Sequence, residues 1–148
     1  STGGYPTIRH NELRDVTANL LKRVATNVAV EPRLQPLTGE RLQYRTAITD
    51  DQARLDVAAS GVWGGRFERV FLDVRVFNPF AQSNRTSSVT NTYQRHEKEK
   101  RRHYGQRVRD NEHATFLPLV FSASGGMGKS ATTFYKRVAS LVSEKTKE

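Results

Sequence analysis

Two aspartates in apolar surroundings are the residues best placed to do chemistry. Asp56 lies in segment 54–61, which alternates as a strand does, and Asp73 lies in the middle of strand pattern 67–77, with Arg75 on the same face. A buried carboxylate is costly unless it is paired or bound to a metal. Facing carboxylates suit Mg²⁺ or Mn²⁺, which activate water and screen a phosphate during nucleic-acid hydrolysis. The local pattern alone slightly favours another interpretation, a structural salt bridge from Asp73 to a nearby arginine.

The position of Lys100 favours the metal-site interpretation of the two aspartates over the structural salt bridge. The pattern predicts a long charged helix over 89–109, and at 100° per residue Lys100 shares its buried stripe with Tyr93 and Tyr104, whereas Lys98 points away. A lysine on a buried stripe needs an anionic partner unless its ammonium group reaches water. The two carboxylates, or a phosphate bound to them, would supply that partner.

Apolar periodicity predicts the elements that position these residues. The order is helix, three strands, helix, strand and helix in one domain, without internal repeats. Asn11 is the expected N-cap of the first helix. The predicted helices cover 11–25, 89–109 and a stretch around 134–142, the strands cover 27–31, 54–61, 67–77 and 116–121, and the polar loop 33–53 holds at most a short strand at 42–44.

Composition narrows the class of protein. The chain has 148 residues, a formal net charge of +9 and a pI near 10.3, which favour a polyanionic partner, most often nucleic acid, over a merely solvated basic surface. It has no cysteine, which excludes disulfides, thiolate zinc sites and a cysteine nucleophile. No apolar run approaches the length of a membrane span, and we expect a nuclear or cytoplasmic protein. Residues 1–7 are expected to be a cloning remnant or disordered arm, and 8–148 a single domain.

This order of elements, with an aspartate in the second strand and D-x-basic in the third, resembles the PD-(D/E)XK restriction-endonuclease-like nucleases. Six segments resemble a domain of invertebrate open reading frames related to retroelement reverse transcriptases, similar to the restriction-like endonuclease of non-LTR retrotransposons; they are 10–15, 31–37, 53–57, 71–79, 96–104 and 116–137. The resemblance spans roughly 8–142. It implies an α/β fold with a restriction-endonuclease-like αβββαβ core, a mixed central sheet flanked by helices, and a C-terminal helix.

The resemblance also implies roles for individual residues. Asp56 matches the first metal-binding aspartate, although Leu55 replaces the usual proline, and Asp73 matches the second acidic ligand. Arg75 stands in the place of the motif lysine, and arginine can stabilise a phosphate but does not readily deprotonate to act as a base. In some members of the superfamily that lysine lies on the following helix, which assigns its role here to Lys100.

Tyr104, one turn after that lysine, completes the implied catalytic set. The implied cofactor is Mg²⁺ or Mn²⁺. The implied partners are double-stranded DNA, RNA as an alternative, and the reverse transcriptase or other domains of a larger polyprotein. The zinc knuckle that commonly precedes these domains is absent from this sequence. Because Arg75 replaces the motif lysine, a catalytically inactive module that binds nucleic acid stays an alternative.

Further basic and acidic residues are candidate contacts. Candidates for nucleic-acid phosphate are Arg9 and His10 before the first helix, Lys98, Arg101, Arg102 and Arg107 on the long helix, and Lys129. The alternatives for them are a disordered arm and a solvated helix face. Glu12, Glu31 and Glu97 are possible further metal ligands or bases, although caps, strand-end charges or surface positions suit them better.

The segment Gly125-GMGK-Ser130 resembles the end of a phosphate-binding Walker loop. The full pattern requires a glycine where Ala123 stands, and no later strand follows to supply a second acidic magnesium ligand. We therefore interpret the segment as a turn into the last helix rather than an ATPase site. Lys129 and the helix N-terminus remain candidate contacts for a DNA phosphate.

Overall fold

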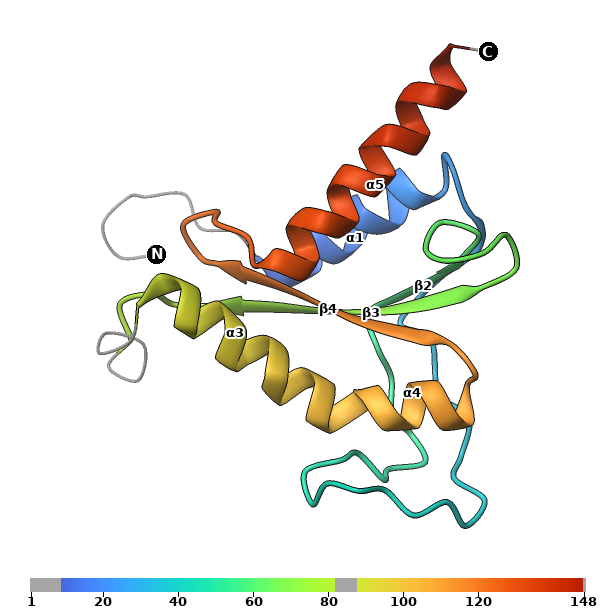
Figure 1. Cartoon of the computed structure of the whole chain (residues 1–148), viewed down its shortest axis with the longest axis vertical. Helices are drawn as coiled ribbons and strands as arrows, with labels where there is room; N and C mark the ends of the chain where they lie inside the picture. The colour runs from blue at the N-terminus through green and yellow to red at the C-terminus, as the bar shows by residue number, and fades with distance from the viewer. Residues whose placement is uncertain (1–8, 82–87, 148) are drawn as a thin grey trace.

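A computed structural model describes residues 9–81 and 88–147 of the chain (Figure 1). The predicted remnant or arm at 1–7, and most of the predicted linker before the long helix, lie outside the described residues. In chain order the elements are α1 (His10–Leu21), β1 (Thr26–Val30), β2 (Val57–Ser60), β3 (Arg69–Phe77), α3 (Val89–Lys100), the π-helical segment η1 (Arg101–Gly105), α4 (Gln106–Asn111), β4 (Thr115–Ser122) and α5 (Lys129–Thr146).

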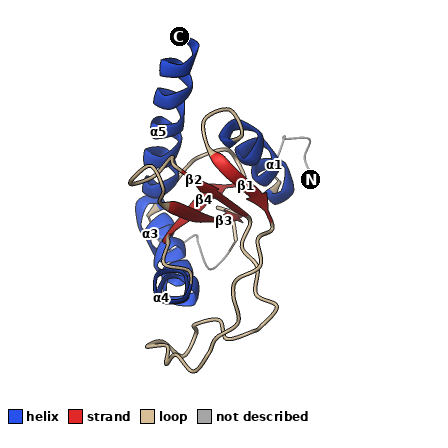
Figure 2. Ribbon diagram, turned by 90° about the vertical axis from the view of Figure 1, so that its right-hand side faces the viewer, coloured by secondary structure: helices blue, strands red, loops and turns tan. Residues whose placement is uncertain are grey.

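The strands form one mixed sheet in the order β1-β2-β3-β4. The β1–β2 and β2–β3 pairs are antiparallel, whereas β3 and β4 are parallel. Parallel neighbours need a crossover, and the run α3–η1–α4 provides it. Helices α1 and α5 cover one face of the sheet, and α3, η1 and α4 cover the other (Figures 1 and 2). The predicted α/β class, with a mixed sheet flanked by helices, is confirmed.

The two faces of β3 separate the core into two parts, as its alternation predicts. Val70, Leu72 and Val74 pack with residues of α1 and α5, whereas Phe71 packs on the opposite face with Val108 of α4. Asp73 and Arg75 share the face of Phe71 because side chains two apart on a strand point the same way. They therefore lie under the helical crossover.

Strand β2 is shorter than predicted, and this changes the place of Asp56. The β2–β3 register starts with Val57 opposite Leu72. Asp56 therefore immediately precedes β2 instead of lying in its middle. Strand β3 continues past this point without a β2 partner, which leaves a notch in the sheet beside Asp56 and Asp73.

Helix α1 begins at His10, with Arg9 at the N-cap position, so the predicted cap at Asn11 is wrong. Asn11 lies inside the first turn, where its side-chain oxygen meets His10 Nδ1 at 2.9 Å. The helix ends at Leu21 rather than near residue 25. The position where α1 starts is set by a tertiary contact of His10, described below, rather than by local capping preference.

The long helix is continuous but not uniformly α-helical. Its middle turn, η1, is a π-helix, and helical structure extends to Asn111, past the predicted end at 109. No strand forms at 42–44; the loop between β1 and β2 runs past α4 instead (Figure 2). An isolated bridge between Arg33 and Arg54 closes the base of that loop.

Candidate active site

Asp56 and Asp73 meet at the notch where β2 begins. Asp56 N–H donates to Leu72 O at 3.0 Å, and Asp56 Oδ2 accepts from Val74 N–H at 2.6 Å. The carboxylate thus takes the place that a backbone carbonyl would occupy if β2 were longer. This bond holds the Asp56 side chain against β3, beside Asp73.

Lys100 reaches the same point from the last turn of α3. Its Nζ lies 2.8 Å from Asp73 Oδ2, and the Asp73 side chain is only 9% exposed. This contact is a short ion pair, and within the described residues Asp73 Oδ2 has no aligned hydrogen-bond donor besides the Lys100 ammonium. Lys100 Nζ also lies 5.6 Å from the centre of the Tyr104 ring, within range of a cation–π interaction.

Burial dominates the electrostatics of this cluster. It raises the pKa of Asp73 to about 6; Lys100 opposes this shift, and a hydrogen bond with Asp56 and the charge of Asp56 add to it. Burial, followed by the charges of Asp73 and Asp56, raises the pKa of Tyr104 to about 12. At neutral pH Tyr104 is therefore a neutral hydroxyl, and Asp73 can exchange a proton near physiological pH.

His10 joins the cluster from the first residue of α1. Its Nε2 lies 3.0 Å from Asp56 Oδ1. Burial alone would lower the pKa of His10, but hydrogen bonds with Asn11 and Asp56 and the charge of Asp56 raise it overall. The sequence predicts His10 only as a phosphate contact. Its pairing with Asp56 is long-range, and no spacing in the sequence indicates it.

Arg75 lies farther along β3 and is half-exposed. Its Nη2 is 3.9 Å from Glu99 Oε2 on α3, a loose ion pair that leaves the guanidinium accessible. Beyond Glu99, a shallow hollow on the outer side of α3 and η1 is lined by Arg95, Lys98 and Arg102. Lys98 is exposed, as the helical projection predicts. A basic surface therefore lies on the solvent side of the helix whose buried side carries Lys100.

The prediction that Arg107 contacts a nucleic-acid phosphate is wrong. It is 1% exposed, and its guanidinium donates to three carbonyl groups of the β1–β2 loop: Ile48 O at 3.2 Å, Asp50 O at 2.8 Å and Gln35 O at 3.1 Å. A guanidinium that is surrounded by backbone oxygens cannot reach a phosphate. Arg107 fixes the loop to α4.

Arg101 turns away from the cluster toward α5. It donates to Ser130 Oγ at 3.1 Å and lies 3.5 Å from Glu97 Oε1. The side chains of Arg9 and Lys129 are exposed, and their predicted contacts with nucleic acid stay predictions. Glu12 is exposed in the first turn of α1. Glu31 lies next to Asp56, since its backbone N–H donates to Asp56 O at 2.8 Å, but its side chain pairs with Arg14 at 3.1 Å.

The position of Glu97 explains why glycines are needed in the segment before α5. Its carboxylate accepts from Ser130 N–H at 3.3 Å and Ser130 Oγ at 3.0 Å, and so caps the N-terminal turn of α5. A β-carbon on Gly128 would lie 2.7 Å from Glu97 Oε2, and one on Gly126 would clash with the Tyr93 hydroxyl. The glycines therefore permit close approach to α3. A carboxylate already stands where a Walker loop would hold a phosphate, which disfavours a nucleotide there.

The donor set at the notch fits one class of metal. Within residues 9–81 and 88–147, no group of three or more histidine or acidic side chains is close enough to hold an ion. Mg²⁺ commonly binds through one or two carboxylates and completes its octahedron with water and substrate phosphate. Asp56 and Asp73, with an under-satisfied buried oxygen on Asp73, fit Mg²⁺ or Mn²⁺ held in that way. They do not fit a closed zinc site.

Comparison of the chain with models of known protein families and with curated proteins found no match. Among the described residues, no helix is long and apolar enough to span a bilayer.

Proposed function

We propose that this chain is a metal-dependent endodeoxyribonuclease domain with a restriction-endonuclease-like core, which nicks target DNA as part of a mobile-element protein. One observation carries the proposal: Asp56 just before β2, Asp73 of β3 and Lys100 of α3 converge at the notch, with Lys100 Nζ 2.8 Å from Asp73. Two carboxylates can hold a divalent ion, and a lysine beside them can stabilise the charge of a phosphate, which together suit metal-dependent phosphodiester hydrolysis. The basic surface on the solvent side of α3 supports a nucleic-acid substrate.

Each residue of the cluster has a distinct task in this proposal. Asp56 and Asp73 would hold the divalent ion, which when bound supplies an activated water and Lewis-acid stabilisation of the phosphate. Lys100, whose Nζ lies 2.8 Å from Asp73 Oδ2, would bind a non-bridging oxygen of the scissile phosphate. Arg75 binds a neighbouring phosphate from its half-exposed position. Tyr104, a neutral phenol, holds the Lys100 ammonium in line through its ring.

A plasmid-nicking assay with Mn²⁺ tests this function. We expect the wild type to relax supercoiled DNA, and Asp73→Asn and Lys100→Ala each to lose at least about a hundredfold in rate, because removal of one charge-stabilising group typically costs that much. Lys136→Ala is the control, since Lys136 is exposed on α5, on the opposite face of the sheet from the aspartates. Undiminished nicking by Asp73→Asn would contradict the proposal.

A second candidate is a catalytically silent module that binds nucleic acid. The D-x-R departure and the direct Lys100–Asp73 ion pair favour it, because a lysine can neutralise a buried carboxylate without any metal. This module would bind double-stranded DNA or RNA with a steep salt dependence, beside the reverse transcriptase of a larger polyprotein. Tight binding without nicking in either Mg²⁺ or Mn²⁺ distinguishes it from the nuclease.

A further inference from the structure

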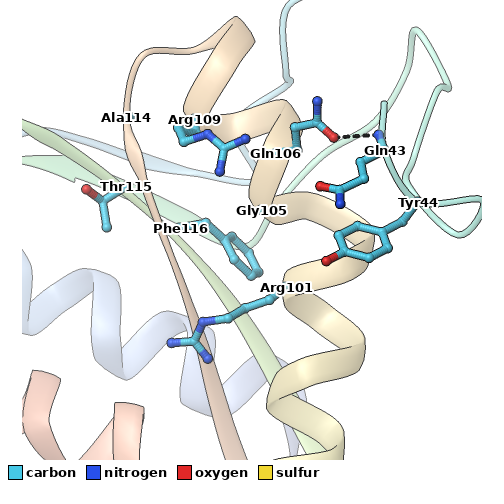
Figure 3. A pocket seen from close by; sticks show the side chains of 9 residues that line it. All are labelled: Gln43, Tyr44, Arg101, Gly105, Gln106, Arg109, Ala114, Thr115 and Phe116. Carbon is cyan, nitrogen blue, oxygen red and sulfur yellow. Dashed lines mark hydrogen bonds between the residues drawn. The ribbon is translucent and has the colours of Figure 1, made fainter. Parts of the chain in front are cut away.

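A second pocket, of about 370 Å³, lies at the free edge of β4, away from the aspartate notch (Figure 3). The β4 edge and Phe116 form one wall, Gly105 and the neighbouring turns of η1 and α4 form another, and Gln43 and Tyr44 of the β1–β2 loop close the third. Its size is in the range of small-ligand sites. None of the chemistry proposed above uses it.

The strand edge offers unused backbone groups to this pocket. Val120 O accepts from Gly128 N–H, and Ser122 N–H donates to Gly126 O, so even-numbered residues of β4 direct their backbone groups away from β3. By the alternation of a strand, the N–H and C=O of Phe116 point outward as well. No hydrogen bond to them from the described residues is present. They face the pocket as one donor and one acceptor.

The β1–β2 loop, which forms one wall of the pocket, is held in place by hydrogen bonds. Gln106 Oε1 accepts from Gln43 N–H at 2.6 Å, and Gln106 Nε2 donates to Arg41 O at 3.1 Å. His103 and Arg107 hold the following stretch of the loop through its carbonyl groups. Tyr44, 44% exposed, is therefore presented from a backbone fixed on both sides. An aromatic residue on a fixed backbone loses less entropy when a ligand stacks on it than one on a free loop.

Planar, polar and cationic groups surround the same opening. Figure 3 shows the rings of Tyr44 and Phe116 there, together with the side chains of Gln43 and Arg109. The Phe116 ring is supported from behind by Tyr104, with the ring centres 5.8 Å apart. Arg109 binds Asp110 through Nε and Nη2, which leaves Nη1 for a ligand. The Gln43 amide can both donate and accept.

We propose that this pocket binds an unpaired nucleobase of a single-stranded nucleic acid. The base stacks on Tyr44 against the Phe116 side of the pocket, its edge bonds to the Gln43 amide and to the Phe116 backbone, and Arg109 binds the adjoining phosphate. Stacking on aromatic rings beside a cation is the usual way in which proteins hold unstacked bases. DNA and RNA share this chemistry, and the net charge of +9 favours either.

An extended peptide added to the β4 edge is the competing occupant, and the edge is poorly suited to it. Pro118 has no N–H to donate, and Val120 and Ser122 are already paired with the segment before α5. Only Phe116 offers both a donor and an acceptor. A pairing strand needs a longer ladder than this, so the nucleobase is the occupant that the geometry favours.

Fluorescence anisotropy with a labelled short oligothymidine, measured in EDTA, tests the site. We expect Tyr44→Ala to weaken single-strand binding roughly 5- to 150-fold, the effect of losing one stacked base, and Tyr44→Phe to retain wild-type affinity. Phe67→Ala is the matched control, because Phe67 is 87% exposed beside Arg66 on the β2–β3 turn, outside the pocket. Because no metal is present, the result is independent of whether the chain nicks DNA.

Amide NMR spectra locate the bound strand. Oligothymidine should shift the Phe116 backbone amide and the Gln43 side-chain amide in the wild type, and these shifts should be lost in Tyr44→Ala. Equal affinities of the wild type, Tyr44→Ala and Phe67→Ala, an equal loss in both variants, or no binding by the wild type, would each overturn the proposal. So would a Phe116 shift produced by an extended peptide and not by the oligonucleotide, which would make this a strand-pairing edge.

Discussion

Asp73 should destabilise the fold at neutral pH. Its pKa is raised from 3.8 to about 6, first by burial, so the folded protein binds a proton that the unfolded chain has already released between these values. Stability therefore falls as pH rises from about 4 to about 6. A charged side chain that weakens the structure it lies in is typical of a site kept for function.

In EDTA, Asp73→Asn should consequently unfold at a higher temperature than the wild type at pH 7, and the difference should shrink toward pH 4. The shift corresponds to at most about 3 kcal/mol, and Lys100 reduces this gain because it loses its partner in the variant. Thermal unfolding followed by circular dichroism across this range measures it. Asp51→Asn, an exposed change in the β1–β2 loop, should follow the wild-type curve. If Asp73→Asn were less stable than the wild type at every pH, the raised pKa of Asp73 would be refuted.

Arg107 is the opposite case, a buried charge that supports the fold. Its bonds to three loop carbonyls would be lost in Arg107→Ala, and a charged hydrogen bond is worth about 1.5–3 kcal/mol. We expect the free energy of unfolding to fall by about 3 kcal/mol or more in urea titration. Arg109→Ala, two residues on in α4 and exposed, should leave the unfolding midpoint unchanged. If both variants unfolded at the same urea concentration, Arg107 would have no clamping role.

At the scale of the elements, the glycine-rich segment before α5 lies so close to α3 that a larger residue at Gly128 should be excluded sterically. A β-carbon on Gly128 would lie 2.7 Å from Glu97 Oε2 and 3.2 Å from Tyr93 Cδ1, and Glu97 cannot swing away without releasing Ser130. Gly128→Ala should therefore destabilise the protein by about 1–3 kcal/mol.

Gly105→Ala is the control for this steric argument. A β-carbon there meets nothing closer than Arg101 Cβ at 3.9 Å. Since alanine is favoured over glycine in a helix, that variant should be neutral or stabilised by up to about 1 kcal/mol. Differential scanning calorimetry ranks the two variants, and a Gly128→Ala protein as stable as Gly105→Ala would show that α3 and α5 do not meet this closely.

The elements also show which features the sequence can predict. The alternation of β3 is a property of any strand, so the common face of Asp73 and Arg75 follows from counting residues. Lys100 was placed correctly because α3 is regular up to that residue. Arg107 stands at i+7 from Lys100, a spacing that puts both on one helical face, and this signal should have outweighed its charge.

Other parts of the site depend on contacts between distant residues and could not be predicted. His10 reaches Asp56 only because α1 crosses the sheet beside the notch. Tyr44 lines a pocket together with β4 because Gln106 and Arg107 fix the β1–β2 loop to α4. Neither contact has a local pattern. The wrong N-cap at Asn11 has the same origin, since capping preference is worth about 1 kcal/mol and a tertiary contact can override it.

For the whole molecule, the excess positive charge should act through one face. Lys98 and Arg102 line the hollow beside Glu99, on the solvent side of α3. Lys22, the C-cap of α1, and Lys136 on α5 are exposed and belong to the helices that cover the other face of the sheet. Duplex DNA that enters the notch would contact the first pair and not the second. Net charge alone would treat the two pairs alike, so a comparison between them separates a binding face from a generally basic surface.

The double variant Lys98→Gln/Arg102→Gln should bind duplex DNA more weakly at every sequence, and its plot of log affinity against log salt should be shallower by about 2, near 0.9 for each lost phosphate contact. The control, Lys22→Gln/Lys136→Gln, removes the same charge and should keep the wild-type slope. Anisotropy titrations of a labelled duplex over a range of salt concentrations, in EDTA, measure both slopes. Equal slopes for the two double variants would mean that the charge acts diffusely and that duplex DNA does not dock along α3. The aspartate notch would then lack the flanking contacts that a nuclease needs to hold a phosphate in line, because phosphate contacts beside the reacting group are what fix its position.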